Sequence, residues 1–306
     1  MMGETVFRRA LVVSLSVCAL VATSAGAADA GPGGVAVLPS PSGALPVGTT
    51  TLHLIDGARP DPFQPDRSRE LTFSVFYPAT DVDRYLRAHY ASTELIPGLE
   101  QKLGIELPGA LVHARRGAPA QAAGTYPVVL YTPGGGVSRI LGTGIAEDLA
   151  SRGYAVVTVD HTYESGPAVE FPGGRIVRPA AAPNGFDTAI REKYVAARLL
   201  DFRFVLDSLA GLDANPSLDA FWQRATGWKR HLAIADSAHY DFTDMPSLVP
   251  AVARPAASTY IGAIDPDRMA MLVRGYVAAM FDKFLRGQAD TVLDRPVTEP
   301  EVTTIR

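Results

Sequence analysis

Buried strands and helices alternate through the middle of the chain. Val128–Tyr131 is a continuous apolar run, which is typical of a strand covered on both faces, and Ala155–Val159 is a second candidate for a buried strand. Between them, apolar residues recur at helical spacing over Ile140–Arg152, and Gly153 supplies a stop signal. A long helix is predicted to follow over about Thr188–Leu212. Strand, helix, strand and helix in this order predict a mostly parallel, doubly wound α/β sheet.

Further elements flank this centre. Thr51–Ile55 and the alternating segment Glu70–Phe76 are strand candidates, and so is His231–Ala235 near the C-terminus. A last helix is predicted from Asp265 to about Arg286, because an Asp-Pro pair is a favourable helix start. The core face of the long helix is expected to carry Val195, Leu199, Phe202, Val205, Leu206 and Leu209.

The N-terminal segment has the pattern of an export signal. Arg8 and Arg9 precede the 13-residue apolar stretch Ala10–Ala22, and small residues around Ala27 suit cleavage. We therefore expect a signal peptide over 1–27, a flexible Gly/Pro/Ser-rich tail over 28–50 and one domain over 51–306. A Sec-type signal predicts a secreted or extracytoplasmic protein with no stable membrane span after cleavage. An uncleaved anchor remains the alternative, although 13 residues are short for one.

Composition limits the kinds of partner. The 306 residues are 47% hydrophobic, enough for a packed core, and the net charge of −4 argues against nucleic acid or an anionic membrane. The single cysteine, Cys18, lies inside the predicted signal peptide. Export would therefore leave a protein held together without disulfides.

Several segments together resemble one family. TYPVVLYTPGGGVSRILGTGIAEDLASRGYAVVTVDH, residues 125–161, is similar to the strand, oxyanion loop, helix and strand of α/β-hydrolases related to platelet-activating factor acetylhydrolase. LHLIDGARPDPF, RELTFSVFYPA, GWKRHLAIADSAHYDFTD and the final helical segment resemble the same group in the same order. The resemblance implies a serine ester hydrolase without cofactor or metal, acting on short acyl esters or phospholipid-like substrates.

The resemblance also assigns two site residues. His239 matches the family's general base, which takes a proton from the serine and returns it to the leaving group. Gly135 matches the residue whose backbone N–H stabilises the oxyanion. A surface-loop histidine and a tight glycine turn are the structural alternatives. Pro133 stands where many relatives have histidine, so this loop departs from the family pattern.

The nucleophile of the family is missing. No G-x-S-x-G occurs in the 306 residues, so the nucleophile and the acid of the triad are unassigned. The long helix passes near Gly211–Ser217 into the segment that precedes His239. Three strand–helix units of about 30 residues each, roughly 90 residues, are absent by comparison with the family. We expect a shortened sheet in which His231–Ala235 takes the vacated place beside Val128–Tyr131.

No other residue clearly replaces the lost serine. Ser138, Ser165 and Ser237 are the alternatives, but none lies on a sharp strand-to-helix turn. Asp236, Asp241 and Asp244 are candidates for the orienting acid of a triad, but turn or capping roles are expected for each. No spacing of His, Cys, Asp and Glu indicates a metal site. Two functions stay open: an ester hydrolase of impaired activity, or a non-catalytic binding protein or shortened, inactive product.

Overall fold

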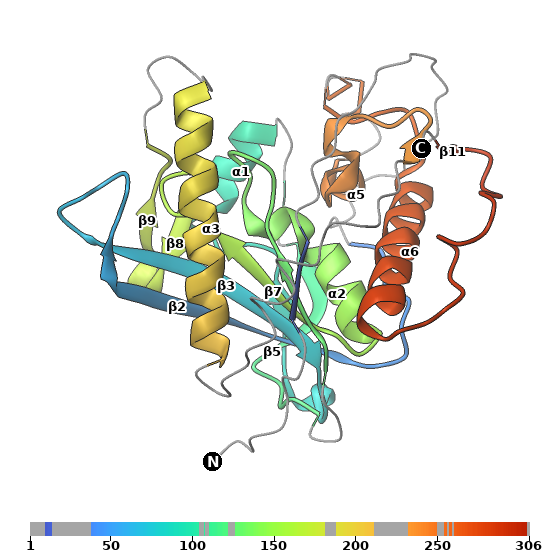
Figure 1. The fold of residues 1–306 in the computed structure, drawn as a ribbon, viewed down its shortest axis with the longest axis horizontal. Helices are drawn as coiled ribbons and strands as arrows, with labels where there is room; N and C mark the ends of the chain where they lie inside the picture. Colours follow the sequence, from blue (N-terminus) through green and yellow to red (C-terminus); the bar gives the residue numbers. More distant parts are fainter. Residues whose placement is uncertain are drawn as a thin grey trace.

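Seven strands form one mixed sheet in the order β1–β6–β7–β3–β2–β5–β4 (Figure 1). The computed structural model describes residues 10–13, 38–103, 107, 110–121, 126–180, 188–210, 232–249, 254–255, 257–258 and 260–304. The strands are β1 Ala10–Val13, β2 Val47–Pro60, β3 Ser68–Pro78, β4 Arg87–His89, β5 Leu111–Arg116, β6 Val128–Tyr131 and β7 Ala155–Asp160. Two two-stranded ribbons lie outside this sheet: β8 Val169–Phe171 with β9 Arg175–Val177, and β10 Leu232–Ile234 with β11 Val302–Thr304.

The helices complete an α/β architecture. The α-helices are α1 Ile96–Leu103, α2 Thr143–Ser151, α3 Thr188–Ala210, α5 Met245–Leu248 and α6 Pro266–Leu285. The 3-10 turns are η1 Val82–Arg84, η2 Arg139–Gly142, η3 Pro172–Gly174 and η4 His239–Phe242. The predicted α/β class is confirmed. The sheet is mixed rather than mostly parallel, because β3 pairs antiparallel with both β2 and β7, whereas β6 pairs parallel with β7 and β1.

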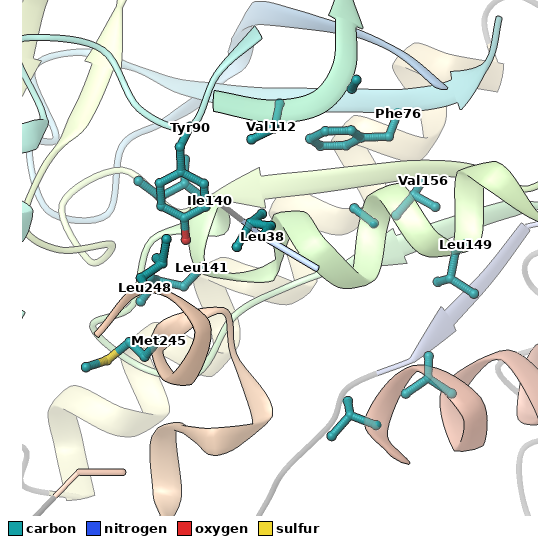
Figure 2. Packing of buried hydrophobic residues seen from close by; sticks show 14 of the residues in the cluster. Leu38, Phe76, Tyr90, Val112, Ile140, Leu141, Leu149, Val156, Met245 and Leu248 are labelled. Atoms are coloured by element: carbon teal, nitrogen blue, oxygen red, sulfur yellow. The ribbon is translucent and has the colours of Figure 1, made fainter. Parts of the chain in front are cut away.

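Alternation along the central strands separates two apolar layers. Leu71, Phe73 and Val75 of β3 pack with α3 on one face. Phe76, with residues of β5, β6 and β7, packs with α1, α2 and α6 on the other. Figure 2 shows Val156 of the sheet near Leu149 of α2, with Phe76 and Val112 further along the same cluster. In Figure 1, α3 lies in front of the long strands β2 and β3, apart from α6. The doubly wound layering predicted from the sequence is therefore present.

The buried face of α3 differs from the prediction in its first half. Phe202, Val205 and Leu206 are buried as expected, but Val195 and Leu199 are 57% and 45% exposed. Tyr194, Ala197 and Asp201 are the residues buried from this half of the helix. The helix turns a charged face inward here because Asp201 pairs with buried arginine side chains, described below. Leu209 lies outside the residues whose side chains are described.

A different strand occupies the place beside β6. The prediction for His231–Ala235 is wrong: β10 pairs antiparallel with β11, and Ala10–Val13 pairs parallel with β6 as β1. The unpaired backbone groups of an exposed strand can pair with any short apolar strand that reaches them. For this reason β1 pairs with β6, and β10 pairs with β11. β1 is rich in β-branched and aliphatic residues. It lies within the segment predicted to be a signal peptide.

The structured body begins before the predicted domain boundary. Leu38 is buried and β2 starts at Val47, four residues ahead of the predicted Thr51. At the helix ends the sequence signals are confirmed: Gly153 has a φ of 89°, and the Asp265 side chain accepts a hydrogen bond from the Arg268 amide at 2.9 Å. Within the described part of the chain, every helix is too short or too polar to cross a bilayer.

Candidate active site

A hydroxyl and an imidazole meet where two parallel strands end. Thr132 directly follows β6 and His161 directly follows β7, so the parallel pairing brings both to the carboxyl edge of the sheet. The Thr132 Oγ1 atom lies 2.8 Å from His161 Nε2. Thr132 is 7% exposed and His161 is fully buried. A buried hydrogen bond between these two side chains therefore joins the adjacent strand ends.

A carboxylate of α3 contacts the other ring nitrogen of His161. The Asp201 Oδ2 atom lies 2.8 Å from His161 Nδ1. The same carboxylate accepts hydrogen bonds from Arg69 at 2.6 and 3.0 Å and from Arg59 at 2.7 Å. Arg69 is fully buried and also donates to Asp61 Oδ2 at 2.8 Å. Thus the buried charges of Asp201, Arg69 and Asp61 each have an opposite charge beside them.

The charges of this cluster determine the imidazole tautomer. Burial by itself would raise the pKa of Asp201, but the hydrogen bonds from His161 and Arg69 hold that pKa well below its usual range. Burial lowers the pKa of His161, although Asp201 opposes the change. His161 is therefore neutral at pH 7. Its Nδ1 proton must point to the Asp201 carboxylate, so Nε2 accepts a hydrogen bond from the Thr132 hydroxyl.

Arg198 of α3 links this cluster to the glycine loop. Its guanidinium donates to the Thr132 hydroxyl at 3.2 Å, to the Pro133 carbonyl at 2.7 Å and to the Gly134 carbonyl at 3.1 Å. Glu164 accepts from the guanidinium at 2.6 Å. One helix therefore holds both the imidazole, through Asp201, and the backbone of the loop that follows β6.

Gly135 lies in that loop, as the resemblance requires for an oxyanion donor. It is exposed, and within the described part of the chain neither the Gly134 amide nor the Gly135 amide has a hydrogen-bond partner. Gly136 has a φ of 72°, which a residue with a side chain rarely adopts. Free amides on a constrained turn are what anion stabilisation needs. The oxyanion role of Gly135 remains a prediction.

His239 stands apart from the buried cluster. It is the exposed first residue of η4, and its ring packs edge-to-face on Tyr240 with centroids 5.2 Å apart. Among the described residues its side chain makes no hydrogen bond, so the structure pairs it with neither an acid nor a serine. Its role as general base also stays a prediction.

The aspartates near His239 have the turn and capping roles predicted for them. Asp241 accepts from the amides of Ala238 at 2.6 Å and Gly262 at 2.8 Å. Asp244 accepts from the Gly144 amide at 3.0 Å and so ties this segment to α2. Asp236 lies in a turn with a φ of 57°.

The three alternative serines are engaged in structural contacts. Ser138 is fully buried, caps η2 and lies 3.4 Å from Asp160. The Ser165 hydroxyl accepts from the His161 amide at 2.9 Å, and the Ser237 hydroxyl donates to the Ile234 carbonyl at 2.7 Å. In the described part of the chain none of these hydroxyls hydrogen-bonds to His239.

Sequence reasoning misses most of the buried cluster. It recognises His161 only as the residue at a strand end, and it assigns no role to Arg69 or Asp201. A usable signal exists, because Asp201 lies one turn before Val205 and hence on the face of α3 that must be buried. Such a position calls for a buried partner of opposite charge. The described residues contain no group of three or more His, Cys, Asp or Glu side chains arranged to hold a metal.

A cavity of about 880 Å³ opens on the face of the sheet covered by α2, and none of Thr132, His161 and Asp201 lines it. It lies between the strands β2 and β3, the β4–α1 segment and the β8–β9 ribbon. Tyr90, Leu95, Ile96 and Phe171 give it apolar walls, and Arg139 lines it next to the glycine loop. A cavity of this size can take a small organic ligand.

The layered sheet, the glycine loop and the polar strand ends define the class as an α/β-hydrolase. A solved structure, a ferulic acid esterase from Streptomyces cinnamoneus, is 31% identical, covers 89% of this chain and 100% of its own, and superposes with a TM-score of 0.73. Residues 38–172 match the family model of platelet-activating factor acetylhydrolase, isoform II. The chain belongs to the platelet-activating factor acetylhydrolase-like esterases of the α/β-hydrolase fold.

A second relative allows the length of this chain to be compared with that of a full esterase sequence. A probable 1-alkyl-2-acetylglycerophosphocholine esterase of Arthroderma benhamiae is 23% identical over 393 residues, covering 95% of this chain and 99% of the relative. The 393 aligned positions exceed the 306 residues of this chain by 87 (393 − 306). At least that many positions of the relative have no counterpart here. The difference agrees with the loss of about three strand–helix units expected from the sequence.

Proposed function

We propose that this protein is an ester hydrolase of greatly reduced activity, which takes short acyl esters or phospholipid-like esters. The observation that carries the proposal is the missing G-x-S-x-G in a chain that is otherwise an esterase of this family. The excess length of the Arthroderma relative supports an internal loss of whole units. A point change in the motif would not shorten the chain.

The substrate class rests on the relatives. One is described as an esterase of an acetylated ether phospholipid, and the other as an esterase of ferulic acid. Both reactions cleave a carboxylic ester, so the shared chemistry is attack on an ester carbonyl. The glycine loop Gly134–Gly136, to which the resemblance gives the oxyanion role, supports this chemistry.

The loss of the serine sets the expected rate. Without the family nucleophile, oxyanion and binding groups retain about 10³–10⁴ of rate enhancement over water. We therefore expect slow hydrolysis rather than the turnover of an intact esterase.

The test is incubation of the purified protein with 4-nitrophenyl acetate and with a serine-reactive fluorophosphonate, followed by peptide mass spectrometry. Slow release of nitrophenol with no labelled serine is the expected result. Robust turnover together with a phosphonylated serine would overturn the proposal.

A non-catalytic binding protein is the second candidate, and the 880 Å³ cavity favours it. A binding role requires only that the cavity admit an ester or lipid headgroup with an acyl chain. Calorimetry with a non-hydrolysable ether analogue of the acetylated phospholipid would measure this. Saturable binding that Phe171→Ala weakens, while the exposed control Phe284→Ala does not, would support the second candidate.

Export is part of the proposal. A signal peptide over residues 1–27 would direct the protein to a secreted or extracytoplasmic location. Expression in a secreting host and N-terminal sequencing of the exported protein test this. A mature N-terminus at Ala28 is expected, in which case the exported protein lacks β1. Retention of an intact N-terminus in the membrane fraction would favour an uncleaved anchor.

A further inference from the structure

Buried hydrogen bonds join the Thr132 hydroxyl to the His161 imidazole and the imidazole to the Asp201 carboxylate. This is the order of groups that activates a hydroxyl nucleophile. From these contacts we propose that Thr132 is the nucleophile of the remaining ester hydrolysis, with His161 as its base and Asp201 as the acid that orients the base. The proposal rests on the proposed function and names the residues behind its slow turnover. It uses neither His239 nor any serine.

Hydrogen-bond direction supports this assignment. Asp201 is held as a carboxylate by Arg69 and Arg59, so it can only accept the proton on His161 Nδ1. That leaves the lone pair of Nε2 directed at the Thr132 hydroxyl, 2.8 Å away. A histidine that served only to fill space could adopt either tautomer. Here the two arginines fix the one that can remove a proton.

Arg198 adds a positive charge at the reacting oxygen. Its Nη1 atom lies 3.2 Å from the Thr132 oxygen. A positive charge at this distance stabilises the developing alkoxide. The same guanidinium donates to the carbonyls of Pro133 and Gly134, so Arg198 contacts both the Thr132 hydroxyl and the glycine loop.

The glycine loop supplies the remaining element. The Gly134 and Gly135 amides follow Thr132 by two and three residues, and they lack partners within the described part of the chain. An ester carbonyl bound over the loop would direct its oxygen to these amides while its carbon lies over Thr132. The predicted oxyanion role of Gly135 therefore fits a nucleophile at Thr132.

The reaction balances with water as the only co-reactant. The Thr132 oxygen bonds to the ester carbon while its proton passes to His161 Nε2, and the negative charge collects on the carbonyl oxygen. Collapse breaks the bond to the alcohol, which leaves with the proton from Nε2. Water then attacks the acyl-threonine and gives a proton to Nε2. The acid departs, and the Thr132 oxygen recovers the proton.

The same geometry explains why such a site is slow. Thr132 is only 7% exposed, and Arg198 lies against its hydroxyl, so an ester must displace this contact to reach the oxygen. The γ-methyl group of threonine also crowds the attacked carbon. A primary hydroxyl at this position would meet less hindrance.

Three forms of the full chain that differ at position 132 test the inference with 4-nitrophenyl acetate. Thr132→Val removes the hydroxyl and should reduce hydrolysis at least tenfold below that of the natural chain, to the residual rate that oxyanion and binding groups supply without a nucleophile. Thr132→Ser keeps the hydroxyl and both contacts, and it should raise hydrolysis above that of the natural chain by about tenfold, because the methyl group is gone. The matched control is Thr298→Val, an exposed threonine whose loss should leave the rate unchanged.

Covalent labelling separates this inference from the proposed function. Fluorophosphonate should label Thr132 in the natural chain, and it should label the same position more rapidly in the Thr132→Ser variant, as mapped by peptide mass spectrometry. Label on a serine of the natural chain with robust turnover would overturn both the inference and the proposed function. Slow turnover that is equal in all three forms would overturn the inference alone. Circular dichroism of both variants verifies that the compared proteins are folded.

Discussion

At the scale of one residue, the fold buries the charged side chain of Arg69, which holds Asp201 against His161. A fully buried guanidinium is costly unless it is paired, and Asp61 and Asp201 supply two carboxylates within 2.8 Å of it. The alternation of β3 puts Arg69 on the same face as Leu71, Phe73 and Val75, but it does not name the carboxylates that a buried arginine needs. Charge pairing between distant elements is the part of the site that local sequence patterns do not reveal.

Asp201→Asn tests the strength of this pairing. The variant leaves Arg69 buried with one carboxylate fewer, so we expect the free energy of unfolding to fall by about 3–5 kcal/mol at pH 7. Urea denaturation measures it, with the exposed Asp207→Asn on the same helix as control. Equal stability of the two variants would contradict the assigned role.

The same variant has a pH signature. The pKa of Asp201 is lower in the folded protein than in the unfolded chain, where aspartate titrates near about 4. Its contribution to stability is therefore present above about pH 4 and is lost as the pH falls toward the folded pKa. Asp201→Asn should flatten the acid limb of the stability curve.

Glu147 gives a pH effect of opposite sign. Its Oε1 atom accepts from the Ala114 amide at 2.5 Å, while Oε2 has no partner among the described residues. Burial, with a contribution from Asp244, raises the pKa of Glu147 to about 7. A raised folded pKa means that stability is fully present below about pH 4 and is lost as the pH rises through about 7.

Glu147→Gln should remove much of that loss. We expect the fall in the free energy of unfolding between pH 5 and pH 8 to shrink by roughly 2–3 kcal/mol, at about 1.4 kcal/mol for each pKa unit. Urea titrations at the two pH values provide the measurement, and the exposed Glu192→Gln is the control. An unchanged pH dependence would show that the buried carboxyl does not titrate in this range.

At the scale of elements, capped and strongly patterned segments are predictable. The helix α6 with its Asp265 cap, the stop at Gly153 and the strands β6 and β7 lie where the sequence indicates them, although Phe284, on the apolar stripe of α6, is exposed. The prediction omits the ribbon β8–β9, although VEFPGGRIV contains a hairpin signal in its Pro-Gly-Gly turn. It omits β5 because that strand is short and partly charged, and only its alternating Val112 and Ala114 are buried.

The strand β1 could not be predicted from its own residues. An apolar stretch after two arginines has the pattern of a signal peptide whether or not it also pairs with a sheet edge. Its pairing with β6 depends on that edge of the sheet being open, which is a property of the whole fold.

Removal of residues 1–27 tests this pairing. Without β1, the amides of β6 that face it lose their partners, and hydrogen exchange should accelerate there by about tenfold or more, because an exposed edge opens readily. Amides of β3, which lies between β2 and β7, serve as the internal control. Unchanged protection of β6 would mean that another segment covers this edge.

At the scale of the whole molecule, the family could be predicted and the arrangement around the gap could not. The order of the family segments survives on both sides of Gly211–Ser217, a stretch that lies outside the described residues. Which strands would close around the lost units depends on long-range pairing, and the prediction for β10 is wrong for that reason. The length itself is informative, as the 393-residue alignment with the Arthroderma esterase agrees with it.

An esterase fold without the family G-x-S-x-G motif should hydrolyse esters only slowly. The most direct measurement is kcat for 4-nitrophenyl acetate, determined on the purified 306-residue chain against the rate in buffer. We expect an enhancement no greater than about 10³–10⁴ over water. A kcat within the range of about 1–10³ s⁻¹ that is typical of intact enzymes, with phosphonate bound to a serine, would contradict it.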